Sequence, residues 1–335
     1  MTNEQDFTQQ AEKFRERYET VKAEIGKVIV GHDDIVHGVL TCMMIGGHCL
    51  LEGAPGLGKT LLVNTLSKAL NLQSNRIQFT PDLMPADILG TNMVVETEEG
   101  GREFQFQKGP IFTQICLADE INRATPKTQS AMLETMQEGT VTVAGNRYVL
   151  DKPFFVLATQ NPIEQEGTYP LPEAQLDRFL FKLVVGYSNK DELTTILDRT
   201  TKGTKIQTDV VMDGREILEW QEVVRQVIVA DHVSDYIVRL NLATHPDGEY
   251  ATPVTNQYLR WGASPRGAQT VVLAAKVRAL LEGRFNLSFE DVRRVYLPAM
   301  RHRVVPNFEA QAEGVTSDQI LLEILDQVSE KGGDA

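Results

Sequence analysis

The chain of 335 residues is 42% hydrophobic and 24% charged, which is the profile of a globular protein long enough for two domains. No apolar run approaches the ~20 residues of a membrane span, and the polar N-terminus lacks the apolar segment of a secretory signal. The three cysteines have neither metal-ligand spacing nor the even count of a disulfide framework, so we expect a cytoplasmic protein without a transmembrane segment. A net charge of −13 disfavours a surface that wraps nucleic acid.

The N-terminal part of the chain predicts one long helix followed by the start of an α/β fold. Apolar residues recur every three or four positions from Ala11 to Val28, and we expect this helix to dock on the core, because only about three heptads are present. A helix over residues 34–45, a buried strand over 48–51 and a helix over 61–70 follow.

Short apolar runs predict four more strands, over residues 76–79, 115–118, 154–158 and 179–185. Residues 80–90 contain two prolines and are expected to form a loop, and a helix is expected over 126–138. Strands that alternate mostly with helices predict a mainly parallel sheet covered on both faces.

Two hairpins are expected between these elements, over residues 92–106 and 140–150. In the first, Phe104 and Phe106 alternate with polar residues, as on one face of a strand. It is either a plain surface hairpin or a projecting insert that touches a substrate, and the pattern leaves both open.

No further strands are expected after Asn189. Helices are predicted over residues 191–202, 216–227, 234–243, 266–281 and 289–303, which indicates a small helical domain. From Glu309 onward seven acids face one lysine, so we expect an acidic, partly mobile tail with a short helix over 320–328 behind a capping box of Thr316 and Gln319. The predicted domains are an N-terminal helix (1–30), a core (31–188), a helical domain (189–308) and the tail (309–335).

A phosphate-binding loop follows the first strand, because the sequence fits the pattern G-x-x-x-x-G-K-[ST]. Its residues are Gly53, Ala54, Pro55, Gly56, Leu57, Gly58, Lys59 and Thr60. The glycines let backbone N–H groups face phosphate oxygens, and the following helix N-terminus adds partial positive charge. Lys59 would reach the β- and γ-phosphates, and Thr60 would offer its hydroxyl to Mg²⁺. An accidental Gly-rich turn is disfavoured because both flanks also match.

Polar residues follow two later strands. Asp119 would hold Mg²⁺, directly or through water, and Glu120 would orient and deprotonate the attacking water. Asn161 could hydrogen-bond the γ-phosphate or that water, and Pro162 biases it to an extended conformation. Acidic or amide residues after a strand are common and would mean little alone. Because Asp119 and Glu120 follow a phosphate loop in the chain, a catalytic role is favoured for them.

Two arginines could stabilise charge on a transferring phosphate. Arg178 precedes a predicted strand, and Arg266 opens a helix of the second domain. A guanidinium supplies positive charge with bidentate geometry. Taken singly, each is more simply a surface arginine.

Together these residues resemble the AAA+ ATPases and, within them, the MoxR family. The matching stretches are residues 53–60, 118–124, 158–162, 166–179 and 262–266. The likeness covers roughly residues 28–308, and the stretch 166–179 is its most specific part. It implies an α/β fold: an AAA+ P-loop NTPase αβα core with a parallel five-stranded sheet of order 5-1-4-3-2, β-hairpin inserts and a small all-α lid.

The resemblance also assigns roles to residues. Lys59 and Thr60 belong to Walker A, Asp119 and Glu120 to Walker B, and Asn161 is sensor 1. Arg178 resembles a finger that reaches a neighbouring subunit's γ-phosphate, with Arg123 as a second candidate ranked below it. Arg266 resembles sensor 2, which closes the lid on the same nucleotide. Val30 and Gly31 lie where such proteins contact adenine through the backbone, and Leu61 completes the nucleotide-binding set.

The family implies a hexameric, Mg²⁺-dependent ATPase that remodels proteins. Such a chaperone-like role would serve protein maturation, cofactor or metal insertion or complex assembly, and the usual partner carries a von Willebrand factor A domain. The client is not identified. A nucleic-acid motor, as in minichromosome-maintenance helicases, is the first alternative, but the second hairpin holds only Arg147 as a cation. A nucleotide-dependent switch or scaffold is the second alternative, and Glu120 argues against it because a switch can do without a water-activating acid.

Overall fold

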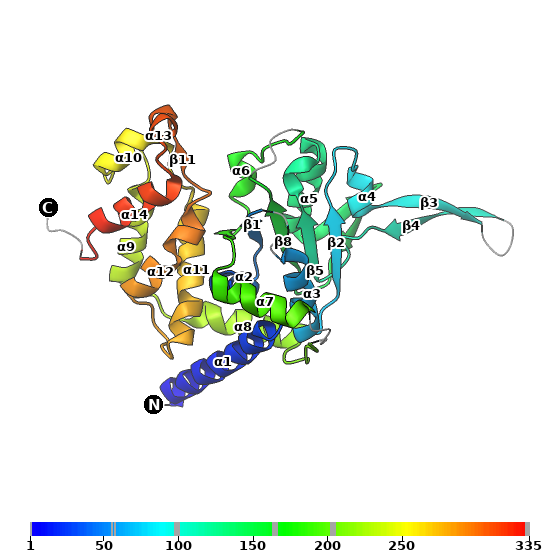
Figure 1. The fold of residues 1–335 in the computed structure, drawn as a ribbon, viewed down its shortest axis with the longest axis horizontal. Coiled ribbons are helices and arrows are strands. Elements are labelled where there is room, and N and C mark those ends of the chain that lie inside the picture. The colour runs from blue at the N-terminus through cyan, green and yellow to red at the C-terminus, as the bar shows by residue number, and fades with distance from the viewer. Residues whose placement is uncertain are drawn as a thin grey trace.

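The computed structural model describes residues 2–54, 56, 58–96, 101–162, 167–201 and 206–331, with side chains from residue 7 onward. An α/β lobe lies beside a helical lobe, and a long hairpin projects from the α/β lobe on the side away from the helices (Figure 1). The sheet strands are β1 (Cys49–Glu52), β2 (Ser74–Gln78), β5 (Ile115–Asp119), β8 (Phe155–Gln160) and β9 (Phe181–Val184).

The five strands are parallel and lie in the order β2-β5-β8-β1-β9. Counted along the chain this is 5-1-4-3-2, so the expected order is confirmed. Successive side chains of a strand point to opposite faces, and both faces are covered here. Leu51 and Leu117 belong to one apolar cluster, whereas Leu50 and Ala118 belong to the other. The αβα arrangement follows from this alternation.

Helices cover both faces of the sheet. The helices of the α/β lobe are α2 (Asp33–Met44), α3 (Lys59–Ala69), α4 (Pro85–Leu89), η1 (Ile121–Arg123), α5 (Pro126–Glu138) and α6 (Glu173–Leu176). Helix α4 lies within the segment that we expected to be a loop. Pro85 is its first residue, where proline is preorganised, and the carboxylate of Asp87 accepts the N–H of Met84 at 2.9 Å.

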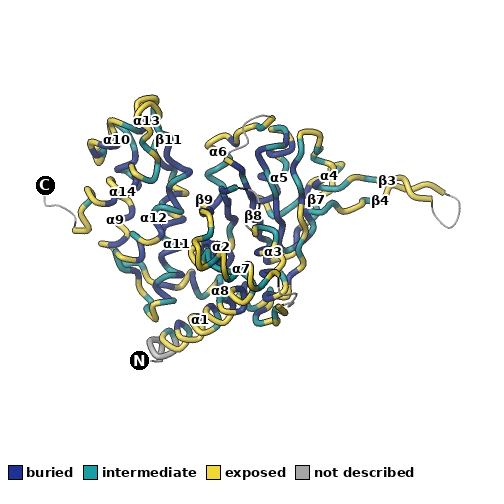
Figure 2. The backbone as a smooth tube through the Cα atoms, in the orientation of Figure 1, coloured by how far each residue is buried: buried dark blue, intermediate teal, exposed yellow. Residues whose placement is uncertain are grey.

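Both expected hairpins are present. The first consists of β3 (Gly90–Glu96) and β4 (Arg102–Lys108), and the second of β6 (Thr140–Val143) and β7 (Asn146–Val149). The first extends well beyond the sheet, and its outer part is exposed (Figure 2). At its base Phe106 stacks on Tyr148 of β7, with ring centroids 4.1 Å apart, so the two inserts support each other.

The N-terminal helix α1 (Thr2–Gly26) docks on the core as predicted. Its buried stripe consists of Ala11, Phe14, Tyr18, Val21 and Ile25. The helix contacts α2 and α3 of the α/β lobe as well as α11 of the helical lobe. It therefore ties the two lobes together along their shared base.

The helical lobe differs from the expectation by the unpredicted helix α10 (Pro253–Tyr258), by a short strand pairing and by an ordered C-terminal stretch. Its helices are α7 (Lys190–Thr201), α8 (Gly214–Gln226), α9 (Asp231–Leu242), α10 (Pro253–Tyr258), α11 (Pro265–Leu281), α12 (Phe289–Met300), α13 (Phe308–Glu313) and α14 (Ser317–Gln327). A short antiparallel pairing of β10 (Leu259–Trp261) with β11 (Val305–Pro306) interrupts the helices. The acidic stretch from Glu309 is not a mobile tail up to Gln327, because Ile320 and Ile324 of α14 are fully buried. Its capping box of Thr316 and Gln319 is confirmed.

Candidate nucleotide-binding site

The phosphate loop connects β1 to α3, as its sequence pattern predicts. Gly56 and Gly58 have φ angles of +83° and +77°, and a Cβ atom at either position would meet nothing within 4 Å. Glycine is therefore required at both positions for the backbone conformation rather than for space. Lys59 and Thr60 open α3, and the Lys59 ammonium donates to the carbonyl of Gly53 at 2.7 Å. Pro55 and Leu57 lie outside the described residues.

The acid pair lies at the end of β5, which β8 separates from β1, the strand that leads into the loop. Glu120 has a φ of +57°, a conformation that costs a non-glycine residue energy and that is found most often at functional sites. Thr159 of β8 holds this bend, because its hydroxyl accepts the N–H of Glu120 at 2.8 Å and donates to Asp119 Oδ1 at 2.6 Å. The Glu120 carboxylate accepts from Gln78 at 2.8 Å and from Arg123 at 3.0 Å.

A polar cavity of about 240 Å³ brings the predicted groups together. It is lined by Gly56, Gly58, Lys59, Thr60, Leu61, Arg76, Gln78, Asp119, Glu120 and Asn161. Burial lowers the pKa of Lys59, while the charges of Asp119 and Glu120 act in the opposite direction. An ammonium, a hydroxyl, two carboxylates and an amide thus face one space at the mouth of the phosphate loop. This set can bind a phosphate chain and activate a water molecule beside it.

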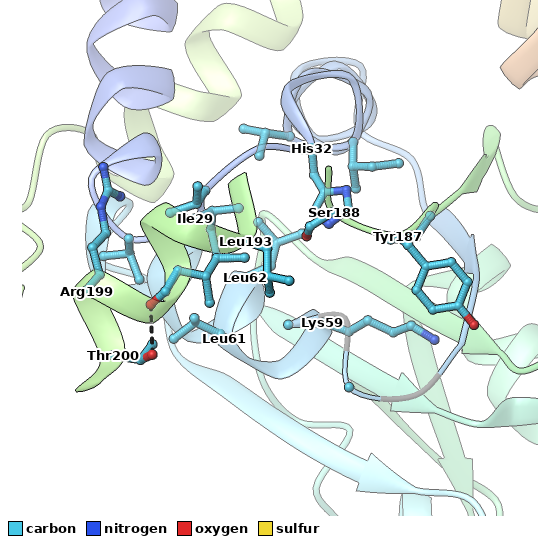
Figure 3. A pocket seen from close by; sticks show the side chains of 18 of the residues that line it. Ile29, His32, Lys59, Leu61, Leu62, Tyr187, Ser188, Leu193, Arg199 and Thr200 are labelled. Carbon is cyan, nitrogen blue, oxygen red and sulfur yellow. Dashed lines mark hydrogen bonds between the residues drawn. The ribbon is translucent and has the colours of Figure 1, made fainter. Parts of the chain in front are cut away.

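An apolar cavity of about 450 Å³ adjoins the polar one, with which it shares Gly56, Gly58, Lys59 and Leu61. Its other lining residues are Val28, Ile29, Val30, His32, Ile35, Val36, Leu51, Leu62, Val185, Tyr187, Ser188, Leu193, Ile196, Arg199 and Thr200. Figure 3 shows Leu193 of α7 facing Leu62 of α3, with Ile29 beside them. A cavity of this kind beside a phosphate loop suits a nucleobase.

The segment that we expected to meet adenine lines or borders this cavity. Val30 is part of the wall. Gly31 follows with a φ of +69°, and a Cβ atom there would lie 2.4 Å from the Glu192 carboxyl carbon. The left-handed backbone conformation favours glycine at this position, and a side chain there would also require the Glu192 carboxylate to move.

Comparison with known proteins supplies the family. The profile of the ATPase family associated with various cellular activities matches residues 48–181, and that of the AAA lid domain matches residues 252–324. Chaperone MoxR1 of Mycobacterium tuberculosis is 40% identical over 306 residues, which span 91% of this chain and 80% of that protein. Protein MoxR of Methylorubrum extorquens is 30% identical over 317 residues, or 89% of this chain and 90% of that protein.

A solved structure agrees. The crystal structure of a candidate ATPase from Cytophaga hutchinsonii matches with a TM-score of 0.90 at 39% identity, and the match covers 98% of this chain and 99% of that chain. This chain belongs to the MoxR family of AAA+ ATPases. Nucleotide binding and ATP hydrolysis are the general activities of such ATPases, and the lid match reaches into α14, in agreement with its packing.

The residues of this MoxR-family site fit Mg·ATP. The loop offers backbone N–H groups, Thr60 a hydroxyl and Asp119 a carboxylate, which are ligands that suit a hard cation together with phosphate oxygens. Within the described ranges, no group of three or more His, Cys, Asp or Glu side chains could hold a metal by itself.

The two predicted arginines lie elsewhere in the MoxR-family fold. Arg178 and Arg266 line a third cavity of about 260 Å³, and neither is among the described residues that line the polar cavity. The expected closure of Arg266 on the same chain's nucleotide is therefore not seen in this conformation. The Nε of Arg178 is buried and has no hydrogen-bond partner among the described residues, so a donor remains available there.

The sequence did not indicate the contacts around Asp177, the neighbour of Arg178. Asp177 accepts from Arg303 at 2.9 Å and from Ser264 at 2.9 Å, and Arg266 lies 3.6 Å from it. Sequence reasoning also missed Arg76 and Gln78 in the polar cavity and all of α7 in the apolar one. The only signal for the cavity in this part of the sequence was the set of apolar residues of α7. In the structure none of them is buried in a core.

None of the helices in the described part of the chain combines the length and the apolar character of a membrane span.

Proposed function

We propose that this MoxR-family protein is a Mg²⁺-dependent ATPase that hydrolyses ATP at the interfaces of a homo-oligomeric ring and uses the energy to remodel a client protein. The observation that carries the proposal is the polar cavity, where Lys59, Asp119, Glu120 and Asn161 meet at the phosphate loop. The adjoining apolar cavity supports a nucleoside triphosphate rather than a free anion, because a base fits beside the phosphates.

In this mechanism each side chain has one role. The loop N–H groups and Lys59 hold the phosphates, and Thr60 with Asp119 would hold Mg²⁺, which supplies charge neutralisation of the β- and γ-phosphates. Glu120 takes the proton of the attacking water, while its bonds from Gln78 and Arg123 fix the carboxylate. Asn161 orients the water or the γ-phosphate through its amide.

A binding and turnover experiment tests the site. Glu120→Gln should keep ATP binding and lower turnover by at least ~100-fold, the usual scale of a general base. Lys59→Ala should weaken binding itself. The proposal fails if Glu120→Gln hydrolyses ATP at the wild-type rate, or if the wild-type protein binds no ATP.

The location of the arginines supports an oligomer. Because Arg178 lines a cavity separate from the polar one, it would complete a neighbouring subunit's site rather than its own, while Arg266 would reach its own chain's nucleotide when the lid closes. Arginines that act between subunits contribute about 10³–10⁵-fold to the rate in well-studied phosphoryl-transfer enzymes. We therefore expect a ring, with a hexamer as the assembly that the family implies.

Complementation distinguishes the two arrangements. Arg178→Ala and Glu120→Gln should each be inactive alone, yet a mixture should recover turnover because each variant supplies what the other lacks. A mixture of Glu120→Gln with the Glu120→Gln/Arg178→Ala double variant is the control without recovery. Absence of recovery in mixed rings of demonstrated composition contradicts action between subunits.

The remodelling role is supported by the name of the chaperone MoxR1 and by the projecting hairpin. A client protein and a partner with a von Willebrand factor A domain complete the proposal. The test compares proteins captured by Glu120→Gln in ATP with those captured by Lys59→Ala. Wild type in ATP is the second comparison: a remodeller releases its client on turnover and holds it only as Glu120→Gln, whereas a nucleotide-dependent scaffold captures the same partners in both.

A further inference from the structure

One cation in the polar cavity has no role in the mechanism above. Arg76 lies on β2, the edge strand of the sheet, and its side chain reaches across to the end of β5. Its Nε and Nη2 donate to Asp119 Oδ2 at 3.0 and 2.7 Å, and Nη2 also donates to the side chain of Gln78. The guanidinium is therefore held in place by two neighbours, both of which line the cavity.

This contact occupies the carboxylate that would hold Mg²⁺. Thr159 donates to Asp119 Oδ1 at 2.6 Å, so each oxygen of Asp119 already has a donor. The hydroxyl is neutral, but the guanidinium carries a positive charge that repels an approaching divalent cation. Arg76 and Mg²⁺ therefore compete for Oδ2.

The guanidinium of Arg76 can leave Asp119 without opening a core, because its side chain is 50% exposed whereas that of Asp119 is 15% exposed. Once it leaves Oδ2, the nearest incoming anion is the phosphate chain of a nucleotide in the same cavity. A guanidinium suits that partner, because its donors match phosphate oxygens bidentately.

From these contacts we infer that Arg76 is a nucleotide-contacting residue that exchanges partners. Its guanidinium covers Asp119 Oδ2 when the cavity lacks Mg·ATP, and it turns to the terminal phosphate when that carboxylate takes up Mg²⁺. The inference rests on the proposed function, because it requires that the cavity bind a nucleoside triphosphate. In the empty site the guanidinium also offsets the repulsion between the neighbouring carboxylates of Asp119 and Glu120.

The test uses Arg76→Gln in the full chain. Arg294→Gln is the matched control, because Arg294 makes an ion pair of the same 2.7 Å length with Glu290, far from the cavity on α12. Partly exposed pairs contribute little to stability, so both variants should fold, which thermal melting verifies. Calorimetry measures the Kd of ATPγS and of ADP in excess Mg²⁺, and a Mg²⁺ titration of fluorescent ADP gives the concentration for half-maximal binding.

Two changes are expected for Arg76→Gln and neither for Arg294→Gln. The Kd of ATPγS should rise about tenfold, which corresponds to one lost charge-assisted hydrogen bond, while that of ADP changes less than about threefold. The half-maximal Mg²⁺ concentration should fall at least about threefold, because the competitor at Oδ2 is gone.

Other outcomes overturn the inference. If both quantities stay within about twofold of wild type, Arg76 forms only a static ion pair. If the Mg²⁺ requirement rises, Arg76 assists Asp119 instead of covering it. If wild-type protein binds neither nucleotide, the proposed function itself has failed, and this result is distinct from the other two.

Discussion

At the scale of single residues, two buried histidines, His48 and His302, and the half-buried His37 show how the folded chain restricts protonation. The ring of His48 accepts the N–H of Val156 at 3.1 Å through Nδ1, so Nε2 carries the proton and donates to the carbonyl of Met136 at 2.9 Å. Burial lowers the pKa of His48 to about 4, and it does the same for His37. Burial also lowers the pKa of His302 well below its usual value.

These shifts predict a loss of stability in mild acid. Between about pH 6.5 and 4 the unfolded chain takes up protons that the folded chain excludes, so the free energy of unfolding falls as pH falls through this window. Each histidine adds a slope of about 1.4 kcal/mol per pH unit. The free energy of unfolding, measured in urea from pH 7 to 4.5, should depend less steeply on pH in His48→Gln than in wild type. An unchanged slope, or an equal effect of the exposed control His232→Gln, contradicts the assignment.

At the scale of elements, helix α7 lines the apolar cavity beside the phosphate loop rather than a core. Leu193 and Ile196 line the apolar cavity, while Leu197 on the same helix does not line it. Arg199 donates to the carbonyl of Lys27 at 2.6 Å, which ties the helix to the end of α1. The apolar side chains of Leu193 and Ile196 are therefore available to contact a bound base.

Two substitutions in α7 measure this contribution. Leu193 and Leu197 are 50% and 53% exposed, so truncation of either should leave the fold intact. Leu193→Ala should weaken ATPγS binding about three- to tenfold, because it removes up to ~1.4 kcal/mol of apolar contact with the base. Leu197→Ala should bind like wild type in the same calorimetric titration. Equal affinities of the two variants would place the base elsewhere.

At the scale of the whole molecule, one carboxylate joins the two lobes beside the predicted finger. Asp177 lies next to Arg178 in the α/β lobe, and its partners Arg303 and Ser264 come from the helical lobe. Arg303 also donates to the carbonyls of Leu180 and Phe179 at 3.0 and 2.7 Å. A shift of the helical lobe would therefore move the segment that carries Arg178.

The strength of this connection can be measured with two arginines that share one partner. The side chain of Arg303 is 1% exposed, whereas that of Arg266 is 46% exposed. Arg303→Met should lower the free energy of unfolding by about 3–5 kcal/mol, because it removes the buried guanidinium that bonds Asp177 and the carbonyls of Phe179 and Leu180. Arg266→Met should cost less than about 1 kcal/mol in the same urea titration. If both variants lost a comparable free energy of unfolding, the burial of the arginine would not determine the strength of its contact with Asp177.

The local parts of the site were predictable from the sequence, and its surroundings were not. The loop from Gly53 to Thr60 and the residues Asp119 and Asn161 were found because each follows a buried strand. The carboxyl ends of parallel strands meet at one edge of a sheet, so their convergence needed no further information. Arg76 lies within a strand and gave no such signal, because only the pairing of β2 with β5 brings it to Asp119.

The sequence by itself therefore indicated the phosphate loop and, through its resemblance to a known family, the family and the order of the sheet. The phosphate loop depends on backbone conformation and apolar periodicity, which act over a few residues. The tertiary structure alone decided that α7 closes the apolar cavity, that the residues after Glu309 pack as helices, and that Arg266 faces Asp177 rather than the polar cavity. Those facts depend on contacts between segments far apart in the chain, where the nearest partner is set by packing and not by local pattern.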